Sequence, residues 1–344
     1  MPVHVETSGV VLELRNLRSR IDTQRGPVFP VNDVTLECHR GRTLAVVGES
    51  GSGKSMTFLS ALGLLPAGGV VESGEIVFEG RTLDTTNISD QRRLRGKSIG
   101  MIFQDALAGL NPAFTIGQQI GDVIRHHDKV SRKAARAQAI ETLGLVGIPE
   151  PAQRVDYYPH QLSGGMRQRV MIAMGIALRP QVLVADEPTT ALDVTVQAQI
   201  MELLDRLRTE LGMSLVIITH DLGVVARYAE EVAVMYSGRV VERGTVEQIL
   251  QSSLHPYTRA LRDSTPRPDA DDAGLRAIPG QPPSIRSLPN GCSFHPRCSV
   301  ARDRAVCFEE VPPLRRLAPD GQLTACHHAE ELLPVPVVRE GVGA

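Results

Sequence analysis

One short run of residues has the composition and spacing of a phosphate-binding loop. It fits the pattern G-x-x-x-x-G-K-[ST] and consists of Gly48, Glu49, Ser50, Gly51, Ser52, Gly53, Lys54 and Ser55. The apolar run TLAVV (43–47) precedes it and the helical pattern MTFLSALGLL follows it, as the motif requires. Glycines let backbone N–H groups turn inward around phosphates, and the start of the helix adds positive potential. We expect all eight residues to bind a nucleotide, with Lys54 on its β- and γ-phosphates and Ser55 on magnesium; a plain Gly/Ser turn is the alternative.

Two carboxylates follow another apolar run. VLVA (182–185) is typical of a buried strand, and Asp186 and Glu187 come directly after it, where α/β sheets place ligand groups. We expect Asp186 to hold magnesium together with Ser55. Glu187 is expected to polarise the attacking water as a general base, as in phosphoryl transfer. An Asp-Glu pair alone is more often a solvated turn, so this interpretation depends on the phosphate-binding loop upstream.

The scaffold that positions these residues is predicted to be α/β. Four apolar runs without polar alternation, at 43–47, 98–103, 182–185 and 214–219, are typical of parallel strands covered on both faces. Three earlier runs alternate apolar and polar residues and predict a smaller antiparallel β-subdomain, namely VVLELRNL, VNDVTLEC and GEIVFEG. The region from about 107 to 180 is rich in Ala, Gln and Arg at helical spacing and predicts a helical subdomain.

Bulk composition excludes some classes of protein. The formal charge of −2 comes from 37 basic and 39 acidic residues, so the chain lacks the excess of positive charge that favours binding of nucleic acid. The N-terminal residues do not have the pattern of a signal peptide, and no run approaches the roughly 18 apolar residues of a membrane span. We therefore expect a cytosolic protein whose work at a membrane, if any, goes through partner subunits.

A second module is predicted after residue 265, where Pro, Gly and Asp become frequent, as in a linker. Four of the five cysteines follow, with the spacing C-x5-C-x8-C-x18-C: Cys292, Cys298, Cys307 and Cys326. In a reducing cytosol such a cluster favours metal over disulfides. The gaps do not fit common zinc modules, whereas four thiolates suit a [4Fe–4S] cluster. Zinc and unmetallated thiols are the alternatives, with His295, His327 and His328 as substitute ligands, and Cys38 is expected to be a small buried residue.

The run LSGGMRQR (162–169) resembles the signature motif of ABC ATPases. A Ser-Gly-Gly turn that opens a helix offers donors to a γ-phosphate. The resemblance implies a P-loop NTPase of the ABC cassette fold, with a RecA-like parallel-sheet core, and an ATP and Mg²⁺ site completed by two subunits. The residues that would serve the ATP of the opposing subunit are Leu162, Ser163, Gly164, Gly165, Met166 and Gln168.

Other positions resemble further parts of the same family pattern. Gln104 resembles the glutamine that touches magnesium and faces the membrane subunits, and His220 resembles the histidine that steadies the γ-phosphate and the water. The run Thr190-Ala191-Leu192-Asp193 is similar to the D-loop. The family usually stacks adenine on an aromatic residue of the β-subdomain, but the matching residue here is Ile21, with Phe29 as the nearest aromatic substitute.

The resemblance extends to one branch of the family, the ATPases of dipeptide and oligopeptide importers. It rests on segments 186–200, 111–120 and 255–261 and on the cysteine-bearing tail. It implies an ABC domain over 1–265 and an extension over 266–344 that carries, in some members, a [4Fe–4S] cluster. The expected partners are a paralogous ATPase in a heterodimer, two transmembrane permease subunits and an external substrate-binding protein, at the cytoplasmic face of the membrane.

Two other functional classes compete with this interpretation. A soluble ABC ATPase acting on nucleic acid or ribosomes usually has a long coiled-coil insertion or two cassettes in one chain, and this sequence has neither feature nor a basic stripe. The other class is a metal- or redox-sensing ATPase, in which the cysteine module gates the nucleotide site. The sensing class predicts that ATP hydrolysis changes with the state of the cysteines, whereas transport predicts that it depends on permeases.

Overall fold

The computed structural model describes residues 9–85, 88–105, 109–190, 192–265, 277–317 and 321–333. Part of the predicted linker (266–276) and most of the tail (334–344) lie outside this range. Residues 277–291 contain neither helix nor strand, in agreement with the irregular segment expected there. Among the described residues, no helix is long and apolar enough to cross a membrane.

The central sheet contains all four strands predicted from apolar runs. These are β3 (Thr43–Val47), β6 (Ile99–Ile102), β7 (Val182–Asp186) and β8 (Ser214–Thr219), which pair in parallel in the order β3-β8-β7-β6. Strands β3, β7 and β8 are buried along their whole length, because side chains on both faces are covered. A further strand that the apolar runs did not single out, β9 (Glu231–Tyr236), pairs in parallel with β3.

The predicted antiparallel β-subdomain is present as a four-stranded sheet in the order β2-β1-β4-β5. Its strands are β1 (Val10–Thr23), β2 (Gly26–His39), β4 (Gly69–Phe78) and β5 (Arg81–Leu83). Alternate side chains such as Leu12 and Leu14 face the core, as the period of two requires. Cys38 is buried in this core, as predicted.

The helical subdomain lies between β6 and β7 in the sequence. Its helices are α4 (Ile116–Asp128), α5 (Arg132–Leu145), α6 (Pro151–Arg154) and α7 (Gly164–Ile176), with the short 3₁₀ turn η1 (Pro159–Gln161) before α7. Thr115 caps α4 in a capping box with Gln118, and Ser131 caps α5, so both helices begin at side chains that satisfy free backbone N–H groups.

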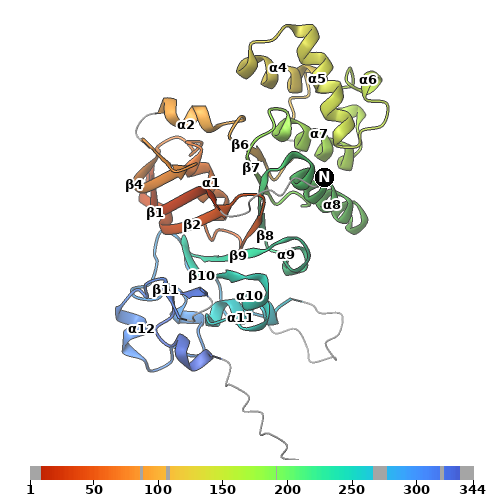
Figure 1. Ribbon diagram of the computed structural model, residues 1–344. Helices are drawn as coiled ribbons and strands as arrows, with labels where there is room; N and C mark the ends of the chain where they lie inside the picture. Colours follow the sequence, from red (N-terminus) through yellow and green to blue (C-terminus); the bar gives the residue numbers. More distant parts are fainter. Residues whose placement is uncertain are drawn as a thin grey trace, which may run out of the picture.

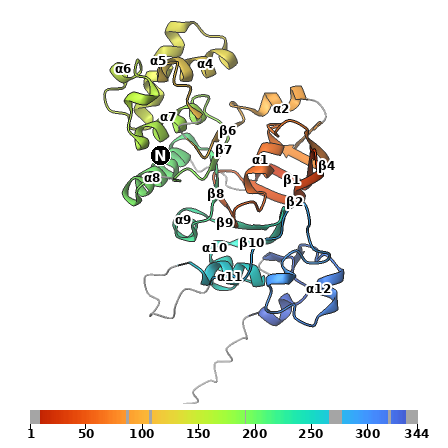
Figure 2. The ribbon, with the colours of Figure 1, turned by 180° about the vertical axis from the view of Figure 1, so that it is seen from behind.

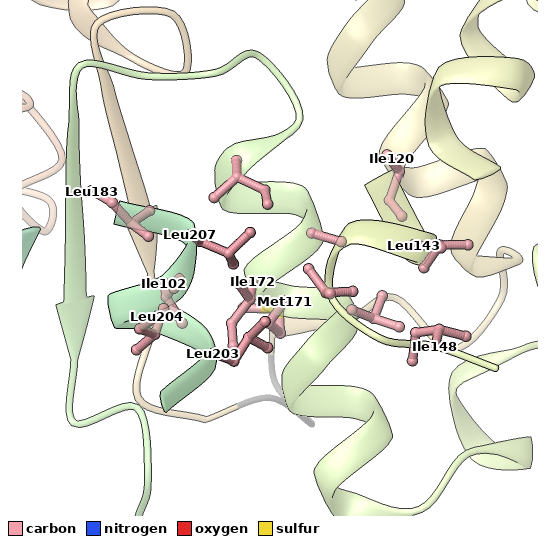
Figure 3. Close-up of a cluster of buried hydrophobic side chains, with 14 of the residues drawn as sticks. Ile102, Ile120, Leu143, Ile148, Met171, Ile172, Leu183, Leu203, Leu204 and Leu207 are labelled. Carbon is pink, nitrogen blue, oxygen red and sulfur yellow. The ribbon is translucent and has the colours of Figure 1, made fainter. Parts of the chain in front are cut away.

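The helical subdomain packs onto the central sheet through one continuous apolar cluster. Figure 3 shows side chains from α4, α5 and α7 together with β7 and the long helix α8 (Val194–Leu211); among them are Ile120, Leu143, Ile172, Leu183 and Leu204. All five are buried. This packing fixes the start of α7, and therefore the signature motif, relative to the strand ends of the sheet.

Within the described ranges, five further helices lie outside the helical subdomain and precede the C-terminal region. They are α1 (Lys54–Ala61), α2 (Ile88–Leu94), α9 (Leu222–Tyr228), α10 (Val246–Gln251) and α11 (Pro256–Asp263). Figure 1 shows α4 to α7 gathered at one end of the molecule, with the β-subdomain beside α1. The view from behind in Figure 2 shows the blue C-terminal region at the other end, next to α10 and α11.

The C-terminal region extends the central sheet. Strand β12 (Leu323–Thr324) pairs with β10 (Arg239–Thr245), which pairs with β9, and β11 (Arg315–Arg316) forms the edge. Its other elements are the short helix α12 (Ala305–Glu309) and the 3₁₀ turns η2 (His295–Arg297) and η3 (Ala329–Leu332). Phe294 packs against Tyr236 and Tyr257 in a core shared with the cassette. The described C-terminal residues are therefore packed directly onto the cassette.

A buried carboxyl group joins these C-terminal elements. Glu242 of β10 accepts hydrogen bonds from the backbone N–H groups of Leu254 and His255 and, at 2.9 Å, from the side chain of Gln322. Burial is the main cause that raises the pKa of Glu242 to about 7, and these hydrogen bonds oppose the shift. Burial also lowers the pKa of neighbouring His255 to about 3, so its ring is neutral near pH 7.

Candidate nucleotide-binding site

The phosphate-binding loop occupies a place where only glycine fits at two positions. Gly48 has a φ of +151°, and a Cβ there would lie 2.2 Å from the carbonyl oxygen of Met235. Gly53, with a φ of +99°, would place a Cβ 2.3 Å from the carbonyl oxygen of Pro30. The backbones of β9 and β2 therefore press on the loop from two sides, and the glycines allow this approach.

Lys54 and Ser55 begin helix α1 directly after this loop. The buried ammonium of Lys54 donates to the carbonyl oxygens of Gly48 at 2.7 Å and Glu49 at 3.0 Å. Burial lowers the pKa of Lys54, while the charges of Glu187, Asp186 and Glu49 oppose the shift. The hydroxyl of Ser55 donates to Oδ1 of Asp186 at 2.9 Å. The two residues predicted to hold magnesium are thus adjacent, and their oxygens suit that ion.

Three side chains converge on the carboxylate predicted to act as base. The amide of Gln104 donates to Oε2 of Glu187 at 2.9 Å and the hydroxyl of Thr190 donates to the same oxygen at 3.0 Å. Nδ1 of His220 lies 3.6 Å from Oε1. The N–H of Glu187 donates to the carbonyl oxygen of Ile218 in β8. Glu187 has a φ of +44°, so the backbone turns sharply where β7 ends.

These side chains meet because the parallel strands end at one edge of the sheet. The loop begins after β3, Gln104 follows β6, Asp186 ends β7 and His220 follows β8. Ligand sites of open α/β sheets lie at this carboxyl edge. Burial raises the pKa of Asp186, a shift to which the charge of Glu187 adds and which the hydrogen bond from Ser55 opposes. The arrangement suits a triphosphate, a magnesium ion and a water placed between Glu187 and the terminal phosphate.

The signature motif starts helix α7. Ser163 is its N-cap, and its hydroxyl accepts a hydrogen bond from the N–H of Met166 at 3.3 Å. Ser163 and Gly164 are exposed, whereas Leu162 is buried in the core of the helical subdomain. The exposed residues can therefore meet a nucleotide held by another subunit.

A further predicted signature residue is buried. Gln168 is only 4% exposed, and its Nε2 makes no hydrogen bond within the described structure. Gln168 lies more than a turn into α7, on the side that faces the core. Its role toward the ATP of a partner therefore stays a prediction.

The D-loop and adenine positions lie in well-defined elements. Asp193 caps α8 by accepting from the N–H of Val196 at 3.0 Å, and Val194 beside it is 82% exposed; Ala191 lies outside the described residues. Ile21 is part of β1 and is partly exposed. The guanidinium of Arg18 lies 4.3 Å from the ring centre of Phe29. Both adenine contacts remain predictions.

Two contacts to the phosphate-binding loop were not predicted. The guanidinium of Arg297 pairs with the carboxylate of Glu49 at 2.6 and 3.0 Å, and the hydroxyl of Tyr257 accepts from the N–H of Glu49 at 2.8 Å. Tyr257 falls in a segment recognised as family-like, but no local pattern marks Arg297. The side chain of Glu49 thus faces the C-terminal region.

The four clustered cysteines line a single small cavity of about 20 Å³, together with His255, His295, His327 and His328. All are free thiols: Cys292, Cys298, Cys307 and Cys326. Burial raises the pKa of each, and negative charge on neighbouring cysteines adds to the shift for Cys292, Cys307 and Cys326. Nevertheless, within the described residues no group of three or more His, Cys, Asp or Glu side chains is arranged to hold a metal ion. The expected [4Fe–4S] or zinc site therefore stays a prediction.

Comparison with known proteins identifies the family. A family model described as ABC transporter matches residues 31–190. The chain is 45% identical over 317 residues to the dipeptide transport ATP-binding protein DppD of Bacillus subtilis, covering 92% of this chain and 94% of that protein. This chain belongs to the ABC transporter ATPases. A second model, the C-terminal region of oligopeptide and dipeptide transporters, matches residues 241–307 of this ABC ATPase.

Other relatives agree with this assignment. The oligopeptide transport ATP-binding protein OppD of Haemophilus influenzae is 46% identical over 316 residues, covering 92% of this chain and 96% of that protein. Among solved structures, CbiO1 of Clostridium perfringens has a TM-score of 0.60 at 30% identity and covers 70% of this ABC ATPase and 91% of that chain. The dimeric bacterial ABC transporter cassette MJ0796 also has a TM-score of 0.60, at 28% identity, with coverages of 68% and 98%. The ABC cassette fold is therefore established.

Proposed function

We propose that this chain is the ATP-hydrolysing subunit of a membrane importer for dipeptides or oligopeptides. The proposal of ATP hydrolysis rests on one observation: the side chains of Gln104, Thr190 and His220 converge on Glu187. Beside them, Ser55 is hydrogen-bonded to Asp186. The peptide specificity is supported by the names of relatives that share 45 to 46% of its residues over nearly the whole chain.

The predicted residues take distinct roles in this proposal. Lys54 and the backbone N–H groups of the loop hold the phosphates, and Ser55, Asp186 and Gln104 bind magnesium, which neutralises phosphate charge during the reaction. Glu187 accepts the proton of the attacking water, and His220 orients the water and the terminal phosphate. Ser163 and the glycines after it act on the ATP held by the opposing subunit.

The proposed partners are a paralogous ATPase in a heterodimer, two permease subunits and an external substrate-binding protein, with this chain peripheral at the cytoplasmic face. Support comes from the relatives, which are named as transport ATP-binding proteins, and from the dimeric cassette of the same fold. The exposed Ser163 and Val194 are suited to a subunit contact. The net charge of −2 supports a partner set without nucleic acid.

The proposed organisation is an ABC domain over residues 1–265 and an extension over 266–344. We also propose that the four clustered cysteines hold a [4Fe–4S] cluster, with zinc as the alternative. The support for the cluster is that these four thiols line one cavity, although they are spread in the sequence from position 292 to position 326. Iron and acid-labile sulfide, measured on the anaerobically purified full chain, test this point. Four irons and four sulfides per chain are expected, and the absence of both would refute the cluster.

Affinity purification of the tagged chain from detergent-solubilised membranes tests the proposed assembly. Two permeases and a second ATPase are expected to co-purify, and the complex is expected to hydrolyse ATP. The same complex carrying Lys54→Ala serves as the inactive control, because it lacks the ammonium that reaches the phosphates. Recovery of the chain with ribosomes or nucleic acid, and without membrane proteins, would contradict the proposal.

A further inference from the structure

A single ion pair joins the C-terminal region to the phosphate-binding loop. Nη1 and Nη2 of Arg297 donate to the two carboxylate oxygens of Glu49 at 2.6 and 3.0 Å. The Arg297 side chain is only 4% exposed, and that of Glu49 is 24% exposed. A two-pronged pair of this kind fixes direction as well as distance, because the guanidinium is planar.

Arg297 is itself held in place on several sides. Its Nε donates to the carbonyl oxygen of Pro279 at 2.8 Å, and Nη1 also donates to the hydroxyl of Tyr236 at 3.3 Å. The guanidinium carbon lies 5.9 Å from the ring centres of both Tyr236 and Phe294. The hydrogen bond with Glu49 is the main cause that raises the pKa of Arg297 above its usual range, so the group is charged at any working pH.

Glu49 is held through its main chain as well. Its N–H donates to the hydroxyl of Tyr257 at 2.8 Å, and its carbonyl oxygen accepts from the ammonium of Lys54 at 3.0 Å. The residue therefore connects Arg297 and Tyr257, outside the loop, with the lysine that is expected to contact the phosphates. A shift of the Glu49 side chain would be transmitted to Lys54 through one peptide unit.

The segment before Arg297 also lies along the loop. Residues 49–52 of the loop line a cavity of about 310 Å³ together with Gln281, Pro282, Pro283 and Ile285. Arg286 then donates to the hydroxyl of Thr23, at the end of β1, at 2.9 Å. In Figure 1 this blue segment rises from the C-terminal region to the β-subdomain. The contact of Arg297 with Glu49 is thus part of a longer contact that the C-terminal segment makes with the phosphate-binding loop and β1.

We propose that Arg297 is a positioning residue of the nucleotide site, which makes the C-terminal region a working part of that site. The inference rests on the ATP site proposed above. Arg297 acts through Glu49: it holds this residue, and through it the start of the loop and Lys54, in the conformation that receives ATP. Loss of Arg297 therefore weakens ATP binding, while turnover at saturating ATP changes little because Glu187 and His220 are not displaced.

The turn that contains Arg297 connects the Arg297–Glu49 ion pair to the cysteines. The N–H of His295 donates to the carbonyl oxygen of Cys292 at 2.9 Å, and the N–H of Cys298 donates to that of His295 at 3.2 Å. Cys292 and Cys298 therefore bracket the turn, and both line the cysteine cavity. A structural change at these two cysteines would reach the phosphate-binding loop through one residue.

The test compares four full-length chains, namely wild type, Arg297→Lys, Arg297→Ala and Arg304→Ala. Arg304 is the matched control, because it makes a two-pronged pair with Glu331 at 2.7 and 2.9 Å in the same region, but at the surface. Binding of a fluorescent ATP analogue gives Kd, and ATP hydrolysis by the purified complex gives KM and kcat. For Arg297→Ala we expect Kd and KM to rise about tenfold or more, with kcat changed less than about threefold.

Arg297→Lys keeps the positive charge but loses the planar group that donates two parallel hydrogen bonds to one carboxylate. Its Kd and KM are therefore expected to lie between those of wild type and Arg297→Ala. The Kd and KM of Arg304→Ala should match those of wild type. Adding Glu49→Gln to Arg297→Ala should cause little further loss, because both changes break the same pair. Equal Kd values for the Arg297 and Arg304 variants would overturn the inference. A lowered unfolding temperature with an unchanged Kd would overturn it as well. If wild type itself binds no ATP analogue, the proposed ATP site fails instead.

Discussion

The amide of Gln104 donates to a carboxylate oxygen of Glu187 at 2.9 Å. The two residues are separated by 83 positions in the sequence and follow neighbouring parallel strands, β6 and β7. Gln104 is exposed, so the residue that touches the proposed base is also open to a partner. Movement of the loop after β6 would therefore change the hydrogen bonding of Glu187.

Replacing the proposed base tests its role. Glu187→Gln keeps the size of the side chain but removes the proton acceptor, so we expect the steady-state rate of ATP hydrolysis to fall by about 100-fold or more. ATP binding should persist, because Lys54, Ser55 and Asp186 are unchanged. Glu202→Gln is the control, since Glu202 pairs with Arg227 on the surface. Unchanged hydrolysis in the Glu187 variant would refute the assignment.

The signature serine is expected to act on a different ATP molecule from the one this chain binds. Ser163→Ala should leave the Kd for ATP of the isolated chain unchanged and lower hydrolysis by the assembled complex. The lost helix cap should also cost about 1 kcal/mol of folding stability. Ser131→Ala is the matched control, because Ser131 caps α5 in the same subdomain. Equal hydrolysis by complexes carrying either variant would contradict the role of Ser163.

Glycine is expected to be essential at Gly53 for steric reasons. Gly53→Ala forces a Cβ against the carbonyl oxygen of Pro30 and a non-glycine residue into a φ of +99°. Gly41 has a φ of +70°, but a Cβ there would meet no atom within 4 Å, so Gly41→Ala should cost only the backbone strain, about 1 to 3 kcal/mol. Urea unfolding should show a larger loss for Gly53→Ala. Equal losses of stability in the two variants would contradict the steric role given to the Pro30 carbonyl oxygen.

The carboxyl group of Glu242 predicts a pH dependence of folding. In the unfolded chain it ionises near 4.5, and in the fold its pKa is raised to about 7. Between these values only the folded state keeps the proton, so the contribution of Glu242 to stability falls as pH rises from about 4.5 to 7 and is constant above. Urea midpoints at pH 5 and pH 8 should differ more in wild type than in Glu242→Gln. The same difference in both proteins would contradict the raised pKa.

The residues at the carboxyl edge of the sheet could be predicted because each lies beside a recognisable strand. The apolar runs of β3, β6, β7 and β8 all form one parallel sheet, and topology then brings their ends together. The structure brings Ser55 next to Asp186 and Gln104 next to Glu187, and the roles of these residues stay predictions.

Other features could not be found from local patterns. Arg297 and Glu49 are 248 residues apart, and an ion pair at that separation leaves no periodicity to detect. Gln168 shares a motif with exposed residues, but the rotation of α7 turns it into the core. The contacts of the C-terminal region with the cassette are also long-range: β12 pairs with β10, and Phe294 shares a core with Tyr236.

The most direct test of the proposed function measures ATP hydrolysis by the reconstituted importer. The complex that co-purifies with this chain is placed in liposomes with its substrate-binding protein, and hydrolysis is compared with and without di- or oligopeptides. A peptide-import ATPase is expected to hydrolyse ATP several-fold faster with peptide and binding protein together than with either alone, and the Lys54→Ala complex is expected to show no such increase. A rate that is insensitive to peptides and to the membrane partners would contradict the proposed function.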